Sequence, residues 1–279
     1  MRSALFAVLS LVLLLPLPDA AHAQSEEAKD TAARLVVRSG LAVQLKSYRK
    51  QVDDELGQSR AALPDGLYEA LRDAARVGYN AEDLQRDITR HIAVNMPLSD
   101  MKQALVWLES DAGRRLTRVE EEAAASMSPQ VIQDYVAEYR QRPPSARRAE
   151  LIGGLIAATR AVEHSAHSVE SIALGIAVGM DAAQPVQNRV GLAELRSRLK
   201  SMLPPEQLRA QMAGVLPVLF AYMYRNTNDA DLAKYLEFNR SPLGNRYNDA
   251  LMLAFVDTLT RASVNMGPLI EQGMRKKST

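Results

Sequence analysis

The sequence predicts an all-α protein, a helical bundle built from two tandem related units. Apolar residues recur at helical spacing along most of the chain, β-branched runs are short, and no Asn-Gly or Asp-Gly turn separates alternating segments. Five residues of an eighteen-residue segment in the first half recur at the same spacing in the second half. With 47% hydrophobic and 24% charged residues, the chain has the composition of a folded protein rather than a disordered one.

Residues 1–23 have the pattern of a signal peptide. Arg2 precedes a nearly uninterrupted apolar stretch from Ala4 to Pro16, which is too short to span a bilayer comfortably. The Ala-His-Ala sequence at 21–23 then offers a cleavage site, so we expect a mature chain that begins at Gln24, with an uncleaved N-terminal anchor as the alternative. The sequence therefore predicts an exported protein, periplasmic in a Gram-negative bacterium, with no transmembrane segment after signal cleavage.

The amino-acid composition argues against several classes of function. The chain has no Cys, which removes disulfides, thiol catalysis and thiolate metal sites. Its 34 Lys and Arg nearly balance its 33 Asp and Glu, which argues against nucleic-acid binding. The common hydrolase, NTPase and dinucleotide-binding motifs do not occur in it. We therefore expect no cofactor and a non-catalytic interaction or structural role, with an unknown protein partner in the cell envelope or a second copy of the chain.

Prolines mark the boundary between the two predicted units. Pro143 and Pro144 cannot lie inside a helix, because each lacks an N–H donor and clashes with the preceding turn. We place a linker at 141–147, between a first unit at 24–140 and a second at 148–279. The first unit has an excess of acidic residues and the second an excess of basic ones, so the two units should attract each other.

The two units share a motif, at 99–116 and at 230–247. Both copies have Asp, Leu, Ser, Gly and Arg at the same spacing, where ordinary residue usage predicts about one identity. The motif also places an aromatic residue, Trp107 or Phe238, at the same position. We interpret it as the product of a tandem duplication, with chance similarity between two amphipathic helices as the alternative. The motif residues are Asp100, Ser110, Gly113 and Arg115 in the first copy and Asp231, Ser241, Pro242, Gly244 and Arg246 in the second.

Each copy of the motif predicts a corner between two helices. Asp231 is expected to be the N-cap of the first helix in its copy. Ser241 followed by Pro242 has the order of an N-cap and the first residue of the next helix. The first copy has Ser110 and Asp111 at this place, so its break could be only a kink.

The glycines of the motif fall in the first turn of the second helix. At Gly113 and Gly244 the missing side chain allows another backbone to approach closely. This arrangement of Asp, Leu, aromatic, Ser, Gly and Arg resembles the conserved segment of an exported bacterial family catalogued as domain of unknown function 2059. The resemblance implies an exported helical domain and brings no activity. A structural role for the motif is our interpretation, and a ligand site at the corner is the alternative.

One short stretch has spacing compatible with a metal site. His164 and His167 are three residues apart and Glu163 precedes His167 by four, so on a helix they could share a face and bind Zn²⁺ or Fe²⁺. A di-iron bundle would need Glu-x-x-His motifs on other helices, and none occurs. The ordinary interpretation is a solvated polar face, and a metal-dependent enzyme is the alternative.

The segment from Met212 to Tyr224 is apolar all round. Such a helix is usually buried, so we expect a core helix that is kinked at Pro217. The sharper alternative is a pocket for a lipid or another apolar ligand, which would make the protein a carrier in the cell envelope. The candidate lining residues are Met212, Phe220, Met223 and Met252.

Small and acidic residues form two further patterns. Gly175 and Gly179 belong to a row of small residues at four-residue spacing, which lets a second helix approach closely. We expect this packing to occur within the chain or in a soluble homodimer. The three consecutive acidic residues from Glu120 to Glu122 are interpreted as the solvated face of a helix.

Overall fold

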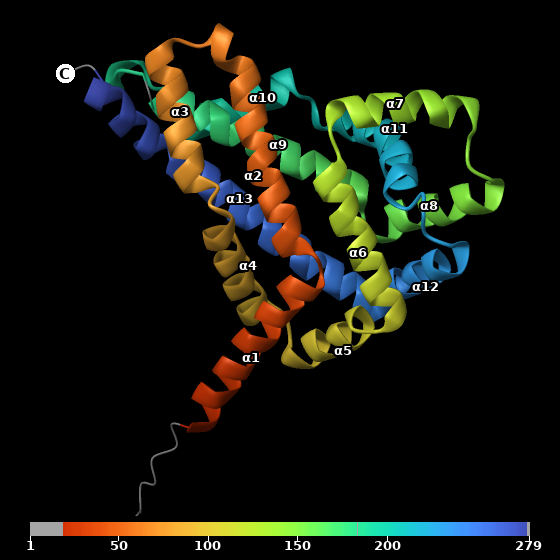
Figure 1. Ribbon diagram of the computed structural model, residues 1–279. Coiled ribbons are helices and arrows are strands. Elements are labelled where there is room, and N and C mark those ends of the chain that lie inside the picture. Colours follow the sequence, from red (N-terminus) through yellow and green to blue (C-terminus); the bar gives the residue numbers. More distant parts are fainter. Residues whose placement is uncertain (1–18, 183, 278–279) are drawn as a thin grey trace, which may run out of the picture.

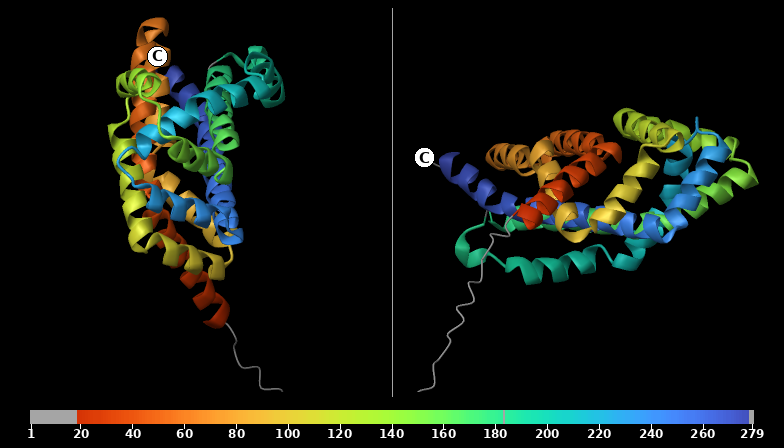
Figure 2. Two further views of the ribbon diagram at one scale, coloured as in Figure 1. Left: turned by 90° about the vertical axis from the view of Figure 1, so that its right-hand side faces the viewer. Right: turned by 90° about the horizontal axis from the view of Figure 1, so that it is seen from below.

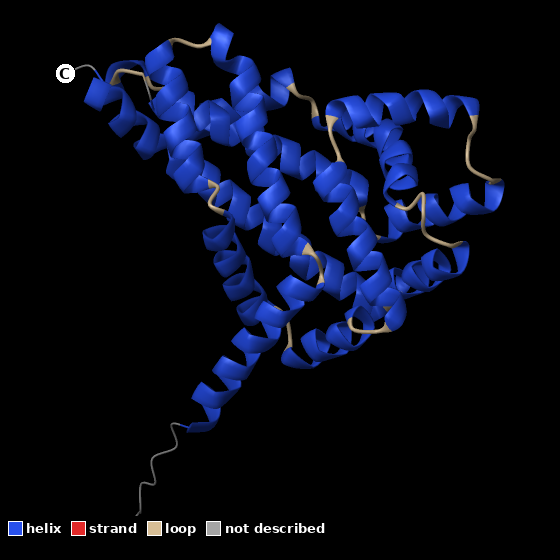
Figure 3. Cartoon of the chain, in the orientation of Figure 1, coloured by secondary structure: helices blue, strands red, loops and turns tan. Residues whose placement is uncertain are grey.

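The computed structural model describes residues 19–182 and 184–277, and every regular element in these ranges is a helix (Figure 1, Figure 3). Thirteen α-helices and two short 3-10 helices follow one another, which confirms the predicted all-α class. In the same ranges, no helix combines the length and the apolar character that a bilayer crossing requires. Most of the predicted signal peptide, residues 1–23, lies outside the described residues.

The helices form two series that are joined by one connecting helix. The first series is α1 (Asp19–Arg38), α2 (Leu41–Ser59), α3 (Asp65–Gly78), α4 (Ala81–Asn95), α5 (Leu98–Leu108) and α6 (Asp111–Ser126). The second series is α8 (Ala146–Ala158), α9 (Ala161–Ala182), α10 (Gly191–Met202), α11 (Pro205–Met223), α12 (Asp229–Arg240) and α13 (Pro242–Lys277). Helix α7 (Pro129–Gln141) connects them, and the loop at 142–145 is shorter than the predicted linker at 141–147.

The two series have the same packing partners. Helix α1 packs against α2, α4 and α5, and α8 packs against α9, α11 and α12. Helix α2 packs against α3, α4 and α6, and α9 packs against α10, α11 and α13. A 3-10 helix follows the second helix of each series, η1 (Arg60–Ala62) in the first and η2 (Val186–Asn188) in the second. The two series thus share an order of packing partners, and the tandem duplication stays a prediction.

The turn between the first two helices of each series uses a left-handed residue. Gly40 stands between α1 and α2 with φ 73°, and Arg160 stands between α8 and α9 with φ 48°. Glycine adopts this conformation freely, whereas a residue with a side chain does so at a cost. Arg160 also forms an ion pair with Asp249 of α13 at 2.7 Å, and this pair connects the turn between α8 and α9 to α13.

Helix α13 is the central element of the fold. It spans 36 residues and packs against α3, α4 and α5 of the first series as well as α9 and α12 of the second. In Figure 2, α13 and α9 lie between α2 and α3 on one side and α10 on the other. A Cβ atom at Gly175 of α9 would overlap Ser263, and one at Gly179 would overlap Ile270. The predicted row of small residues therefore packs within the chain.

Two apolar cores hold the helices together. The larger core joins α1 to α5 with α13, and the smaller one joins α6, α8 and α12 with Tyr224, which follows α11. Trp107 and Tyr235 pack against both cores, so the two series share one continuous interior. Fully buried side chains of this interior include Leu35, Ile88, Met101, Leu155, Leu232, Leu259 and Ile270.

The apolar segment from Met212 to Tyr224 is only partly buried. It forms the second half of α11, and Pro217 lies inside this helix, which continues to Met223. Ala213 and Gly214 are exposed, while Leu216 and Tyr222 are buried. The prediction of a core helix therefore holds for only part of the segment, because α11 packs against α6, α7, α8 and α9 but leaves Ala213 and Gly214 exposed.

The two motif copies fold into corners of the same shape. The backbone at Ser110 has φ −68° and ψ 163°, and the backbone at Ser241 has φ −68° and ψ 155°. Each serine hydroxyl accepts a hydrogen bond from the N–H of the motif glycine, Gly113 at 3.1 Å or Gly244 at 3.0 Å. Both serines are therefore N-caps as predicted, Pro242 is the first residue of α13, and the first corner is a full break.

The motif aspartates are not N-caps. Asn228 is the N-cap of α12, because its side chain accepts the N–H of Asp231 at 2.8 Å. The prediction of Asp231 as the N-cap is wrong by three residues. Asp100 lies in the first turn of α5, which follows Pro97. Asp231 Oδ2 accepts from the side-chain amide of the cap Asn228 at 3.1 Å, and both aspartates have a further partner on another helix.

The aspartate of each motif pairs with the arginine of the other motif. Arg115 donates through Nε and Nη2 to both carboxylate oxygens of Asp231, at 2.9 and 2.8 Å. Arg246 donates in the same way to Asp100, at 2.7 and 3.0 Å. The hydrogen bonds from each guanidinium hold the pKa of both carboxyls below the ordinary value. The two corners are therefore joined by reciprocal, bidentate ion pairs.

The motif aromatics fill the space between the corners. The rings of Trp107 and Phe238 are stacked, with centroids 4.9 Å apart and an interplanar angle of 11°. Stacked aromatic pairs contribute about 1 kcal/mol beyond the area that they bury. The residues shared by the two motifs thus face each other, and the motif forms one part of the contact between the two series, beside the packing of α13 on α3 and α4.

We predict that Gly113→Ala and Gly244→Ala each destabilise the protein by about 2 kcal/mol or more, because the new methyl group overlaps backbone. A Cβ at Gly113 would overlap the carbonyl oxygen of Trp107, and one at Gly244 that of Phe238. Gly153 is the matched control, since it lies in α8 with open space around its Cβ position. Gly153→Ala should instead stabilise by about 0.5–1 kcal/mol. Urea unfolding measures all three, and equal effects at Gly113 and Gly153 would contradict the close corner packing.

We predict that Asp231→Asn lowers the Tm by a few degrees at neutral pH, because it removes a charge-assisted pair with Arg115. A carboxyl whose folded pKa is depressed stabilises the fold above its unfolded pKa and loses this effect as the pH falls. The difference in Tm between wild type and variant should therefore shrink below about pH 3.8. Asp87→Asn, which removes an exposed pair with Arg90, should change the Tm far less. An equal loss of Tm in Asp231→Asn and Asp87→Asn would contradict a stabilising pair between Asp231 and Arg115.

Candidate ligand-binding cleft

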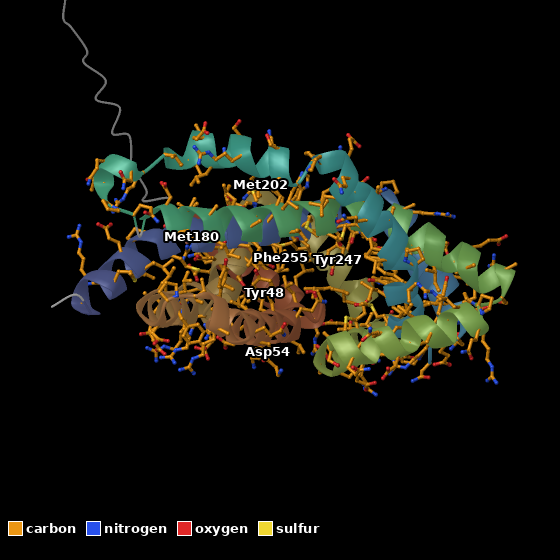
Figure 4. All side chains as sticks on the ribbon, turned by 90° about the horizontal axis from the view of Figure 1, so that it is seen from above. Tyr48, Asp54, Met180, Met202, Tyr247 and Phe255 are labelled. Carbon is orange, nitrogen blue, oxygen red and sulfur yellow. The ribbon has the colours of Figure 1, made fainter. Side chains whose placement is uncertain are left out.

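A cleft of about 500 Å³ lies where the two series meet. Its walls come from the turn between α1 and α2, from α6 of the first series, and from α8, α9, α11, α12 and α13 of the second. Figure 4 labels Tyr247 and Phe255, which lie about two turns apart on α13 and both line the cleft. The apolar and aromatic lining residues are Leu41, Leu155, Val169, Phe220, Met223, Tyr224, Tyr235, Tyr247, Leu251, Met252 and Phe255.

Three of the four predicted pocket residues line this cleft. Phe220, Met223 and Met252 belong to its wall, and Met212 does not. Met212 precedes Phe220 by eight residues, which places it about 12 Å farther along α11. The sequence therefore predicted an apolar pocket at this helix but extended it too far toward the start of the apolar segment.

The cleft is lined by one carboxyl group, that of Glu120 on α6. The hydroxyl of Tyr224 donates to Glu120 Oε1 at 2.6 Å. Loss of hydration raises the pKa of Glu120, while hydrogen bonds from Tyr224 and Tyr235 oppose this rise. Among the described residues, no Lys, Arg or His forms an ion pair with Glu120. The cleft thus holds an acidic group without a cationic partner.

The interpretation of Glu120 to Glu122 as a solvated face is wrong for Glu120. Only Glu122 of the three is exposed. The sequence does contain the signal, because Glu120 follows the buried Leu116 by four residues and precedes the buried Ala123 by three. This spacing puts Glu120 on the inward face of α6.

Tyrosine side chains surround the Glu120 carboxyl. The rings of Tyr224 and Tyr235 meet edge to face with centroids 6.3 Å apart, and Phe220 meets Tyr224 at 5.9 Å. Burial raises the pKa of Tyr224, Tyr235 and Tyr247, so their hydroxyls stay protonated and act as donors. The wall of the cleft is therefore aromatic, and the hydroxyls of Tyr224 and Tyr235 hydrogen-bond to Glu120, whereas that of Tyr247 has Ser39 as its partner.

The cleft lies between equivalent positions of the two series. Glu120 follows Ser110 by ten residues in α6, and Leu251 follows Ser241 by ten residues in α13. Both residues line the cleft. One side therefore supplies a carboxyl and the matching position on the other side supplies an apolar side chain.

The predicted metal-site residues do not converge. His164 lines the cleft, whereas Glu163 and His167 are exposed on other parts of α9. Within residues 19–182 and 184–277, no group of three or more His, Asp or Glu side chains is placed to hold a metal ion. Burial and the nearby Arg160 lower the pKa of His164, so this imidazole is neutral at neutral pH. The structure therefore does not bring these three residues together at one site.

Two grooves of about 520 and 510 Å³ occupy matching places on the surface. One lies between α1 and α5 and includes Lys102 and Glu109, and the other lies between α8 and α12 and includes Glu237 and Arg240. Their walls are rich in charged side chains that pair with one another or face solvent, as Arg34 and Glu109 do at 2.9 Å. These grooves lack the aromatic lining of the cleft and form no comparable site.

Comparison with protein-family models, with curated proteins and with solved structures finds no match to this chain. The resemblance to the family of domain of unknown function 2059 is thus neither supported nor refuted, and stays an expectation based on the motif.

We predict that the stability of Glu120→Gln, compared with that of the wild type, increases as the pH rises. A carboxyl whose folded pKa is raised stabilises the fold below its unfolded pKa, and this contribution is lost as the pH rises through the folded pKa. The wild type should therefore lose stability against Glu120→Gln above about pH 4.5, the ordinary value for this carboxyl. Urea unfolding of both proteins across this range gives the difference. Glu122→Gln, at an exposed position, should follow the wild type at every pH.

Proposed function

We propose that this protein binds an apolar small molecule in the cleft between its two helical series. The observation that carries the proposal is the cleft itself, which combines a volume of about 500 Å³ with an aromatic and methionine lining. Binding sites for small molecules are commonly 300–1,000 Å³ in volume and have mostly apolar walls with a few polar groups. Met223 and Met252 add flexible, polarisable side chains that adapt to ligands of different shape.

The proposed place of action is outside the cytoplasm. The support is the sequence at 1–23, with a short apolar stretch followed by Ala-His-Ala. In a Gram-negative bacterium the protein would be a periplasmic carrier of a lipid or another apolar ligand. No catalytic step is part of this proposal.

Native mass spectrometry of the purified protein tests the proposal. We expect a population whose mass exceeds that of the polypeptide by one small hydrophobic molecule, or such a population after addition of decanol. Ala161→Phe should weaken this binding, because Ala161 lines the cleft and a phenyl ring there takes up part of its volume. Ala157→Phe is the matched control on the exposed face of α8, and should bind as the wild type does. Equal binding by the two variants would reject the cleft as the site.

A non-catalytic interaction module is the second candidate function. Its support is a series of exposed, large apolar side chains along α9, η2 and α10, where a soluble surface is usually polar. These residues are Ile176, Met180, Val186, Val190, Leu192, Met202 and Leu203. Met180 and Met202 are labelled in Figure 4, on α9 and at the end of α10. An unknown envelope protein or a second copy of the chain would cover this surface.

Site-specific photo-crosslinking in cells tests this second candidate. A photoreactive residue at Met202, which is 78% exposed, should give one discrete crosslinked product. The control is Val94 of α4, which is 76% exposed and stands alone on its helix, and it should give none. Identical results at the two positions would reject the surface as an interface.

A further inference from the structure

The carboxyl groups at the junction of the two series fall into two kinds. Asp100 and Asp231 each form a bidentate pair with an arginine of the opposite series. Glu120 lies between the same two series but has only tyrosine hydroxyls for partners. Withdrawing an ionised carboxylate from water is costly unless a cation or several donors compensate it. The carboxylates at the corners therefore have cationic partners, whereas Glu120 in the cleft has none among the described residues.

Glu120, the one carboxyl group of the cleft lining, favours a ligand group that donates hydrogen bonds or carries positive charge. A carboxylate has about four acceptor positions, and the hydrogen bonds from Tyr224 and Tyr235 use only part of them. Acceptors therefore remain at Glu120 for a ligand group that carries protons or positive charge. An anionic ligand would meet like charge instead, because no Lys or Arg lines the cleft.

The walls around Glu120 attract positive charge as well. Phe220, Tyr224, Tyr235 and Tyr247 all line the cleft, and the first three are linked by ring contacts. Aromatic faces attract ammonium groups, more strongly where water is excluded. The aliphatic part of the lining, Leu251 and Met252 of α13, continues from the aromatic part and can cover an apolar ligand body.

Resting on the proposed ligand-binding role, we infer that the cleft selects organic cations, in which an amine or quaternary ammonium group is attached to an apolar body. Glu120 is the counter-ion of the cationic group, and the rings of Phe220, Tyr224 and Tyr235 form its surroundings. The apolar body lies against α13. Glu120 is thus the residue that determines specificity, and the volume of the cleft permits many apolar bodies.

Matched ligands that differ only in the head group test this inference. Decylamine, decyltrimethylammonium, decanol and decanoate are titrated into the purified full-length protein below their micelle-forming concentrations. Calorimetry measures affinity, and the fluorescence of Trp107 reports occupancy, since this single tryptophan stacks on Tyr235 with centroids 6.4 Å apart. We expect both cations to bind about tenfold or more tightly than decanol, because each of them places positive charge beside Glu120. Decanoate should bind most weakly.

Three variants test which residues cause the preference for cations over decanol. Glu120→Gln keeps the size of the side chain and should abolish the preference for the amine over decanol, while the exposed Glu122→Gln should keep it. Phe220→Leu keeps an apolar wall without the ring, and should weaken the binding of decyltrimethylammonium roughly threefold with little effect on decanol. Phe220 is only partly buried, so its replacement leaves the core intact and gives an answer even where Glu120→Gln does not fold.

The outcomes separate this inference from the proposed function. If decanol binds as tightly as the amines, or if Glu120→Gln retains the amine preference, the cation inference is overturned and the ligand-binding role stands. If none of the four compounds binds, the ligand-binding role fails and the inference fails with it. Tight binding of both cations that is lost in Glu120→Gln supports both.

Discussion

The reciprocal pairing of two arginines with two aspartates joins the halves of this molecule. Each pair connects residues that are more than a hundred positions apart, and each is bidentate and largely shielded at its carboxylate. The fit between the corners depends on glycine at positions 113 and 244, where any side chain would overlap backbone. The stacked rings of Trp107 and Phe238 close the remaining space. The packing of α13 on α3 and α4 and the larger apolar core hold the two series together as well.

The cleft is a consequence of the same contact. Helices α6 and α13 begin at the two corners, and beyond the corners both line the cleft. Aromatic contacts lead from the corners into the cleft wall, because Trp107 stacks on Tyr235 and Phe238 packs on Tyr247 with centroids 5.8 Å apart. A change of geometry at either corner would therefore alter the position of the tyrosines around Glu120.

The two series differ where their equivalent positions face the cleft. Asp100 and Asp231 play the same part on both sides, whereas Glu120 and Leu251 do not. A second carboxyl at position 251 would place like charges in one small, poorly hydrated space. The symmetric residues thus form the contact between the units, and the asymmetric ones give the cleft its chemistry.

The sequence by itself determined the helical class, the two related corners and their serine caps, because periodicity and capping depend on residues a few positions apart. It also indicated an apolar pocket near Phe220 and Met223. Only the tertiary structure decided that Asp231 pairs with Arg115 instead of capping its own helix, that Tyr224 donates to Glu120, and that the histidines do not converge. These outcomes depend on contacts between distant segments, and one sequence read locally contains no information on which of its faces will meet.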